Sequence, residues 1–527
     1  MTQDARRDAA LALHRFGLGP RPGLIAAIAS DPRGALLAEL ERPGAGRIDD
    51  PELPSSAAAS RAAFEARAAR QAQRVIAQRA EKEAERLKAE RQAAGAVGDE
   101  AAQTAGMATD TPKPAPQAEQ GPPIERQMFL REIRARLDAA SAAEIGFPER
   151  LVWFWSNHFC VSAGKVFNMA GGYEREVIRP HILGRFADML LAAEGHPAML
   201  FYLDNSSSIG PNSVAGINRT RGLNENLARE ILELHTLGVE SGYTQDDVTR
   251  FACVLTGWTI IPAANDPAHG SEFIFNRRMH EPGPQRVMDK TYADTGVEQG
   301  RAVLADVARH PAVAAHVARK LARHFVADEP PPALVERVAA TFRARDGDVK
   351  AMLRTIVASP EFWAPDARRA KIKKPFEYVA SAVRAMGGHV DARAGFLLAR
   401  SAAEMGEGLY GAQPPTGYPD RAEAWVNAGA LLARMNFALA LTQRRLPGVT
   451  LDLSPLAVDR AAPDAALERL LTSLLHGAAS AQTRAVPVAQ LANPEIRRQT
   501  PDDRGPANTD VEKLAALVIG SPEFQRR

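Results

Sequence analysis

Apolar residues recur every three or four positions along most of the chain from residue 124 onward. This spacing places them on one face of a helix and is typical of helices that pack against a core. Helix-boundary signals agree, because Thr244 with Asp247 resembles a capping box and Gly238 stands where a helix commonly ends. The predicted helices of this part are 124–142, 147–161, 177–193, 223–238, 245–258, 299–308, 311–326, 332–343, 347–359, 374–387 and 421–443. Since only residues 272–275 alternate like a strand, the pattern predicts an all-α fold.

Residues 57–123 interrupt this pattern with a change of composition. From about 57 to 92 the chain is mostly Ala, Arg, Glu, Lys and Gln, which favour helices, but apolar residues are too sparse for a coiled-coil seam. We expect a solvated helix there, followed by a flexible, disordered linker over 93–123. The chain then divides into N-terminal helices of the main body at 1–56, an insertion at 57–123, a main helical domain at 124–364 and a C-terminal helical portion at 365–527.

A short repeat links the last two parts. The sequence Ser-Pro-Glu-Phe occurs at 359–362 and again at 521–524, each time after an apolar helical segment. Proline ends the preceding helix and can begin a new turn. We expect this repeat to mark two similar helical units, and we assign it no chemical role.

Charge and cysteine content exclude several classes of protein. Lys and Arg number 65 against 63 Asp and Glu, so the net charge of +2 gives no electrostatic case for binding nucleic acid or an anionic membrane. Cys160 and Cys253 lie far apart, which argues against a zinc knuckle, an iron–sulfur cluster or a disulfide framework. We expect a cytoplasmic protein, because neither a signal-peptide pattern nor a window of roughly 18 apolar residues is visible.

Five stretches between residues 153 and 290 concentrate His, Glu, Asp and Asn in otherwise apolar segments. On the predicted helix 223–238, Asn226, Glu230 and Glu233 share one face, with Arg229 at its edge. His235 lies two residues beyond Glu233 on another side of the final turn. Carboxylates in such a helix must be solvated, paired with a cation or bound to a ligand. These stretches are 153–159, 196–205, 224–238, 243–258 and 273–290.

The same stretches resemble the DUF1800 family, a bacterial domain of unknown function. The resemblance rests on the helix with Trp155, His158 and Phe159, on Tyr202-Leu-Asp-Asn205, Asn224-Glu-Asn226, the run from Arg229 to Gly238, Gly242-Tyr-Thr244, Leu255-Thr-Gly-Trp258, His280-Glu281 with Lys290, the helix from His310 to Val326, Met405 to Tyr410, and Pro414 to Asp420 with Trp425. It covers roughly 1–55 and 124–527, and Glu281 replaces the Asp that is usual in the family. The resemblance implies a fold and a set of positions, with no reaction attached.

Our leading hypothesis is a metal-dependent enzyme, hydrolytic or oxidative, with its site in the helical body. Carboxylate and imidazole ligands together favour Fe, Mn or Zn. The candidate ligands are His158, Asp204, Glu230, Glu233, His235 and His280. Glu230, Glu233 or His235 could also act as a general base, while Arg229 and Lys290 could neutralise charge or bind an anionic group. The Glu-x-x-His spacing of di-iron bundles is absent, since Glu233 stands where the histidine would be.

The alternative is a non-catalytic helical scaffold or partner-binding protein in which the polar residues form a structural network. Members of the resembled family often accompany a second uncharacterised protein that resembles sulfatases, which leaves a protein partner open, and some carry export signals. We interpret two further groups as surface features without a chemical role. We expect His316, Lys320 and His324 to form a solvated stripe on one helix, and the segment 371–374 to be a basic surface patch.

Overall fold

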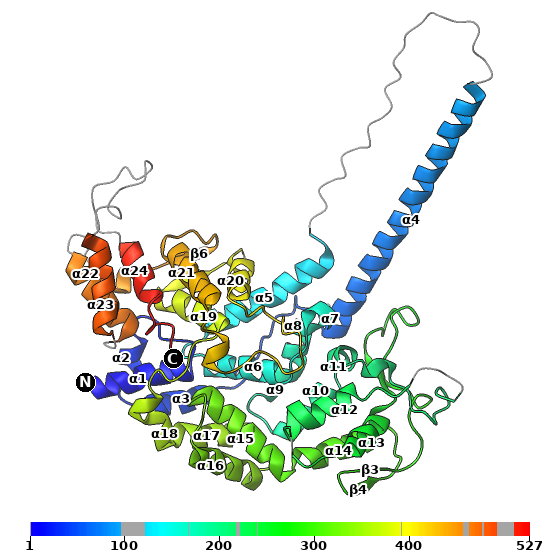
Figure 1. The fold of residues 1–527 in the computed structure, drawn as a ribbon, viewed down its shortest axis with the longest axis horizontal. Coiled ribbons are helices and arrows are strands. Elements are labelled where there is room, and N and C mark those ends of the chain that lie inside the picture. Colours follow the sequence, from blue (N-terminus) through cyan, green and yellow to red (C-terminus); the bar gives the residue numbers. More distant parts are fainter. Residues whose placement is uncertain are drawn as a thin grey trace, which may run out of the picture.

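The computed structural model describes residues 2–95, 122–166, 168–217, 222–239, 241–391, 393–456, 463–476, 479–492 and 511–527. These residues form a mostly helical body with a few short strands, so the predicted all-α fold is confirmed apart from three small sheets (Figure 1). No helix in the described part of the chain is long and apolar enough to cross a membrane.

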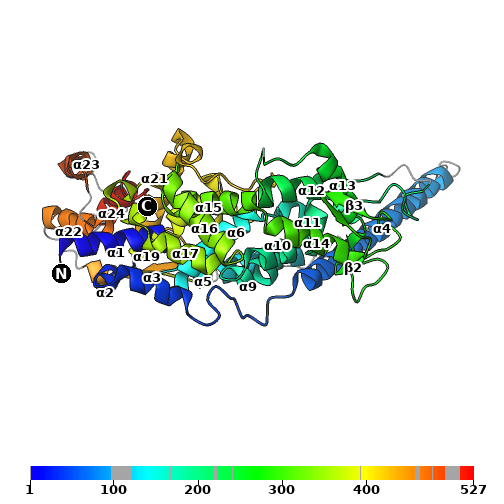
Figure 2. The same ribbon diagram turned by 90° about the horizontal axis from the view of Figure 1, so that it is seen from below.

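The chain begins with three helices of the body, α1 (Gln3–Arg15), α2 (Leu24–Ile28) and α3 (Pro32–Leu40), and continues into the long helix α4 (Ser56–Gly95). From residue 71 to residue 90 every side chain of α4 is exposed, and the helix projects away from the body (Figures 1 and 2). A solvated helix was expected here. The predicted linker at 93–123 lies almost entirely outside the described residues.

The middle of the chain packs around α5 and α6. Its helices are α5 (Ile124–Ala142), α6 (Phe147–His158), α7 (Ala163–Val166), α8 (Met169–Tyr173), η1 (Glu174–Ile178), α9 (Arg179–His181), α10 (Phe186–Glu194), α11 (Pro197–Tyr202), η2 (Asn205–Ser207), α12 (Asn226–Glu230), η3 (Ile231–Thr236) and α13 (Gln245–Leu255). The strands form antiparallel pairs: β1 (Trp258–Ile260) with β2 (Phe273–Phe275), β3 (Gln285–Val287) with β4 (Lys290–Tyr292), and β5 (Gly388–Val390) with β6 (Val449–Leu451). The strand-like alternation at 272–275 thus corresponds to β2.

The remaining helices belong to the second half of the chain. They are α14 (Val297–Ala308), α15 (Pro311–Phe325), α16 (Pro332–Ala344), α17 (Val349–Ala358), α18 (Pro360–Trp363), η4 (Pro365–Ala367), α19 (Pro375–Ala385), α20 (Ala394–Glu404), η5 (Ala422–Ala424), α21 (Ala428–Thr442), η6 (Ser454–Leu456), α22 (Pro463–Leu475), α23 (Ala481–Ala492) and α24 (Val511–Ile519). In both copies of the Ser-Pro-Glu-Phe repeat the serine hydroxyl accepts a hydrogen bond from the phenylalanine N–H, at 3.4 Å in the first and 3.3 Å in the second. The two copies therefore share this hydrogen bond, although the first enters helix α18 and the second lies in a turn.

One hydrophobic core joins the first helix to the last parts of the chain. Phe16, just after α1, packs its ring 4.6 Å from that of Phe147 on α6. It also lies 4.8 Å from Phe325 on α15 and 4.6 Å from Phe362 on α18. Such ring pairs add to the large apolar area that each aromatic side chain buries. Segments more than 300 residues apart in the sequence therefore share a single core.

A buried network of ion pairs accompanies this core. Glu377 on α19 forms ion pairs with Arg150 of α6 at 2.7 Å and with Arg527 at 2.8 Å. All three side chains are at most 3% exposed. Arg15 at the end of α1 donates to the carbonyl groups of Phe325 and Arg527 at 3.0 and 2.8 Å. Buried charges require such partners, because an unpaired charge in the interior is costly.

The expected basic surface patch at 371–374 is wrong, because its three lysines are buried. Lys371, Lys373 and Lys374 are 2%, 1% and 5% exposed. The backbone of this segment pairs with residues 525–527, and Lys371 forms ion pairs with Asp328 and Asp420. Sequence alone could not show this, because the acidic partners and the pairing backbone come from distant segments.

Replacing Glu377 with Gln should destabilise the protein strongly, since two guanidinium groups would lose their buried counter-charge. We expect a loss of about 3–5 kcal/mol in the free energy of unfolding, measured by urea denaturation. Arg134→Met is the matched control, because Arg134 and Asp138 form an exposed pair at 3.2 Å, and such pairs contribute about 0–1 kcal/mol.

The ion pairs of Glu377 also predict that the stability of the folded state depends on pH in the acid range. The arginine neighbours lower the pKa of Glu377 to about 2 against the opposing effect of burial. A depressed carboxyl pKa stabilises the folded state above the ordinary glutamate value of about 4.3, and this contribution is lost as the pH falls toward 2. A Gln variant as stable as wild type at pH 7 would show that Glu377 does not organise this interior.

Candidate functional site

The centre of the predicted polar cluster is a buried pair of His235 and Glu194. His235 Nδ1 lies 2.8 Å from Glu194 Oε1, and neither side chain has any exposed surface. His235 stands on η3, a π-helical turn that continues α12, and turns of this kind occur frequently at functional sites. Glu194, the last residue of α10, was missed by the sequence analysis. The available signal was its position at the end of an apolar helix, directly before the predicted stretch that begins at His196.

Two further histidines bind the carbonyl groups at the end of η3. His158 Nε2 lies 3.1 Å from the carbonyl oxygen of His235, and His316 Nε2 lies 3.3 Å from that of Leu234. A carbonyl only accepts, so both Nε2 atoms donate. The ring of His158 is 6.1 Å from that of His235 and 6.3 Å from that of His316. Burial lowers the pKa of His316 to about 4 and holds that of His158 well below its usual range, so both rings are neutral at pH 7.

Glu230 and Glu233 lie beside this cluster and are half-buried. Burial raises the pKa of Glu230, and the nearby Glu233 adds to the effect while His235 opposes it. Glu233 interacts with the hydroxyl group of Tyr243 and, together with burial, raises the pKa of that phenol. Arg229 donates instead to Glu225 and Gln245, each at 3.0 Å, so its nearest acceptors are not Glu230 or Glu233.

Helix α15 also lines the cluster. Its residues His316, Lys320 and His324 were expected to form a solvated stripe, and they do not. His324 is 1% exposed and its Nδ1 lies 2.7 Å from Asp420. Lys320, between His316 and His324 on the same face, is half-buried, and burial lowers its pKa to about 8, while Cys160 and Asp420 oppose that shift. The expectation was wrong because segments distant in the sequence meet this stripe: Asp420 pairs with His324, and His316 bonds to the Leu234 carbonyl.

That loop also covers Cys160, which follows α6. The Cys160 thiol donates weakly to the carbonyl groups of Pro414 and Pro415, at 3.5 and 3.4 Å. Burial raises the pKa of Cys160 to about 11, so the group is a thiol and not a reactive thiolate at neutral pH. The Tyr202 hydroxyl donates to the Gln413 carbonyl at 2.7 Å.

Gly417 allows the loop to approach α6 closely. Its φ of 70° is in the left-handed region, and a Cβ there would lie 2.3 Å from the carbonyl oxygen of Asn157. Next to it, Asn157 clamps the backbone of Tyr418, donating to its carbonyl at 2.8 Å and accepting from its N–H at 2.7 Å. The Pro-Pro-Thr-Gly-Tyr motif thus positions a loop over the cluster, a role that the sequence analysis did not assign.

Three predicted site residues make their contacts elsewhere. Asp204 pairs with Lys165 at 2.7 Å, and both side chains are largely exposed. His280 Nδ1 donates to the Thr256 carbonyl at 2.8 Å, behind the β1–β2 sheet. Lys290 on β4 forms an exposed ion pair with Asp306. The structure therefore brings together His158, His235, Glu230 and Glu233, but gives Asp204, His280 and Lys290 no contact with them.

The described part of the chain holds no group of three or more His, Cys, Asp or Glu side chains arranged to hold a metal ion. The ring nitrogens explain this, because His158 and His316 direct Nε2 at carbonyl groups and His235 directs Nδ1 at Glu194. His158 Nδ1 and both ring nitrogens of His235 are buried and have no partner with hydrogen-bond geometry, although His235 Nδ1 lies 2.8 Å from Glu194 Oε1. The predicted metal centre stays a prediction.

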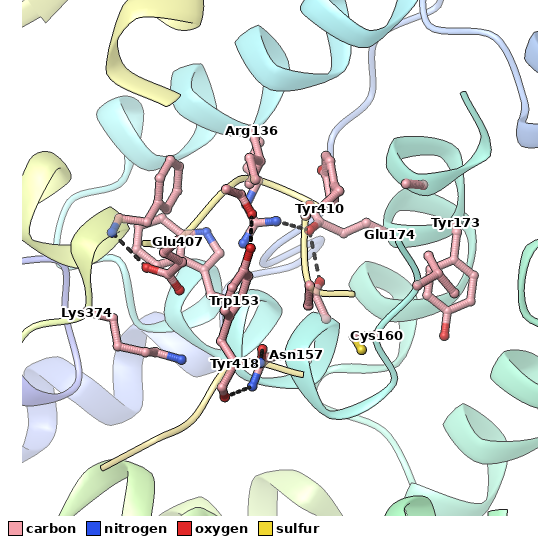
Figure 3. A pocket seen from close by; sticks show the side chains of 18 of the residues that line it. Arg136, Trp153, Asn157, Cys160, Tyr173, Glu174, Lys374, Glu407, Tyr410 and Tyr418 are labelled. Atoms are coloured by element: carbon pink, nitrogen blue, oxygen red, sulfur yellow. Dashed lines mark hydrogen bonds and ion pairs between the residues drawn. The ribbon is translucent and has the colours of Figure 1, made fainter. Parts of the chain in front are cut away.

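A cavity adjoins the cluster on the far side of Cys160 (Figure 3). It measures about 60 Å³ and lies between α5, α6, the start of α19 and residues 407–418. Cys160, Asn157 and Tyr418 belong to its lining, so the same loop bounds the cluster and the cavity.

Comparison with known proteins gives a family and no relative of known activity. The family described as a protein of unknown function, DUF1800, matches residues 11–526. No curated protein and no solved structure matches the chain.

Replacing Glu194 with Gln should destabilise the protein, because the amide removes the negative charge beside His235 Nδ1 and leaves only a weaker, neutral acceptor. We expect a loss of about 1–3 kcal/mol in the free energy of unfolding, measured by urea denaturation. Glu233→Gln is the control, since Glu233 is half-buried and should cost less than about 1 kcal/mol. Equal effects of the two substitutions would show that the Glu194–His235 pair does not organise the site.

Proposed function

The chain belongs to the DUF1800 family, and we propose that it is an enzyme that performs hydrolytic acid–base chemistry at the cluster between α6, α12, α15 and the 413–420 loop. One observation carries the proposal: Glu230 and Lys320, both half-buried, lie in the same cluster and have pKa values shifted toward neutrality. Cys160 connects them, because both charges affect its thiol. Groups shifted in this way gather at catalytic sites, because proton transfer is most efficient when the pKa lies near the working pH.

The two groups have complementary roles in this proposal. Glu230 takes a proton from an attacking water molecule, and Lys320 supplies positive charge or a proton to the oxygen on which negative charge develops. Partial exposure lets both meet a substrate from solvent, whereas Glu194 and His235 are enclosed. The enclosed pair is a positioning element that fixes η3, and with it the direction of Glu230. Cys160 is not the nucleophile, since its pKa of about 11 keeps it protonated.

Variants of Glu230 and Lys320 test the proposal against panels of chromogenic ester, amide and phosphoester substrates. Once an active substrate is found, Glu230→Gln and Lys320→Met should each lower kcat by about 100-fold or more, because each removes a proton-transfer or charge-stabilising group. The wild-type rate should depend on a group with a pKa near 8, and that dependence should vanish in Lys320→Met.

Lys165→Met is the matched control, because Lys165 is a largely exposed lysine paired with Asp204. It should leave the rate unchanged. Folding of each variant is checked by circular dichroism. Wild-type rates in folded Glu230→Gln and Lys320→Met would end the proposal.

A metal-dependent form of this enzyme is a separate prediction. The metal content of protein purified without a metal-affinity tag, measured by elemental mass spectrometry, tests it. Near-stoichiometric Fe, Mn or Zn that is lost from a folded Glu230→Ala, His235→Ala double variant would place a metal at the cluster. If metal-free protein turns over substrate at an unchanged rate, the reaction depends on Glu230 and Lys320 without a metal.

A second candidate function is partner binding through α4. It is favoured by the twenty exposed positions from 71 to 90, which include Val75, Ile76 and Leu87 at 40%, 66% and 49% exposure. A partner-binding protein would keep its function in both Glu230→Gln and Lys320→Met, so the variants above distinguish the two proposals.

A further inference from the structure

The cavity beside Cys160 is lined by side chains that offer hydrogen-bond donors without acceptors. Arg136 Nε and Trp153 Nε1 are buried and have no hydrogen-bond partner, although Arg136 also donates through Nη1 to Glu174 at 2.7 Å. The two residues are 7% and 6% exposed. A buried donor without an acceptor costs about 1–3 kcal/mol. Two such donors in one small cavity therefore indicate a missing acceptor.

Lys374 adds a positive charge to the same cavity. Its side chain is 5% exposed and extends from the start of α19 toward Trp153 and Tyr418 (Figure 3). Among the described residues no carboxylate lies within ion-pair distance of its ammonium group, in contrast to the neighbouring Lys371 with Asp328 and Asp420. The charges of Glu377, Glu407 and Asp420 are nevertheless close enough to interact with it electrostatically.

Lys374 also occupies the N-cap position of α19, an eleven-residue helix. At this position a side-chain oxygen normally accepts hydrogen bonds from the N–H groups of the first turn. An ammonium group only donates and cannot do so. Glu407 accepts one of these N–H groups, that of Phe376, at 2.8 Å. The helix start therefore adds its own positive end to the donors of the cavity.

Acceptors on the cavity wall are already used or are disfavoured as anions. Asn157 uses both ends of its amide on Tyr418, and the Tyr418 hydroxyl donates to the Gly408 carbonyl at 2.9 Å. Burial raises the pKa of Glu407, which favours its uncharged form. The volume of about 60 Å³ is room for roughly four or five water-sized spheres, so a ligand group of a few heavy atoms fits.

From these unmatched donors and the lysine aimed among them, we propose that the cavity binds an oxyanion group, a carboxylate or a phosphate, on a small molecule. Lys374 holds its charge, and Arg136 Nε and Trp153 Nε1 donate to its oxygens. The aromatic rings of Trp153, Phe376 and Tyr410 enclose the group, with Arg136 over all three rings at 5.2–5.6 Å. The site goes beyond the proposed hydrolytic chemistry at Glu230 and Lys320, and it does not depend on it.

Isothermal titration of the full chain with acetate, malonate and inorganic phosphate tests the site, with acetamide as the neutral comparison. We expect at least one anion to bind and to change the fluorescence of Trp153, and acetamide not to bind. Carboxylate binding without phosphate binding, or the reverse, identifies which oxyanion is preferred. Absence of binding by all three anions, or equal binding of acetamide, overturns the proposal.

Substitutions locate the binding. Lys374→Met should weaken it by about 10-fold or more, as expected for the loss of a hydrogen bond to a charged group, while Lys374→Arg should retain most of it. Lys165→Met, the exposed control, should bind like wild type. If Lys374→Met does not fold, Trp153→Phe removes one donor alone and should weaken binding about several-fold. Unchanged affinity in the folded donor variants overturns the assignment.

This result is independent of catalysis, since no readout needs turnover. An anion that binds through Lys374 in a protein whose rate is insensitive to Glu230→Gln would leave this site standing and remove the proposed function. The opposite result, activity that requires Glu230 without any anion binding, would do the reverse.

Discussion

The carboxylate of Glu377 joins parts of the chain that are far apart in the sequence. It receives Arg150 from α6 and Arg527 from the last described residues, all enclosed in the core. A buried charge is tolerated only when its partners are in place, so this interaction fixes the relative positions of α6 and α19 and of the segment at 525–527. Around it, Asp420 meets His324 and Lys371 in the same way. The apolar core supplies most of the stability, and the paired charges make its arrangement specific.

The candidate site depends on that arrangement. Asp420 ties the 413–420 loop to α15 through His324, and Asn157 ties the same loop to α6. Because both attachments lie within a few residues of Gly417, the loop closes over Cys160. Burial shifts the pKa of Lys320 toward neutrality, and the thiol of Cys160 becomes inert for the same reason. The buried network in the core and the candidate site at its edge are therefore physically linked.

Backbone geometry explains why the histidines gather at the end of η3. The π-helical turn η3 leaves carbonyl groups at its end, and His158 and His316 donate to those of His235 and Leu234. An unpaired carbonyl group in this interior would lower the stability of the fold. These two rings therefore stabilise the fold, whatever reaction the protein performs. Glu194 meets the remaining ring, His235, from another helix. Glu230 and Lys320 lie beside these rings and stay half-buried.

The sequence by itself determined the helical class, the position of the solvated helix α4, and the two polar stretches that contain His158 and, further along the chain, Glu230, Glu233 and His235. Periodicity and composition are local properties, and they carry this information directly. Only the tertiary structure decided which polar groups meet. It paired His235 with Glu194, separated Asp204, His280 and Lys290 from the cluster, left Lys320 half-buried, and buried the 371–374 segment. Partners such as Asp420 and Arg527 come from segments far away in the chain. A single sequence does not show which of its distant segments meet in space.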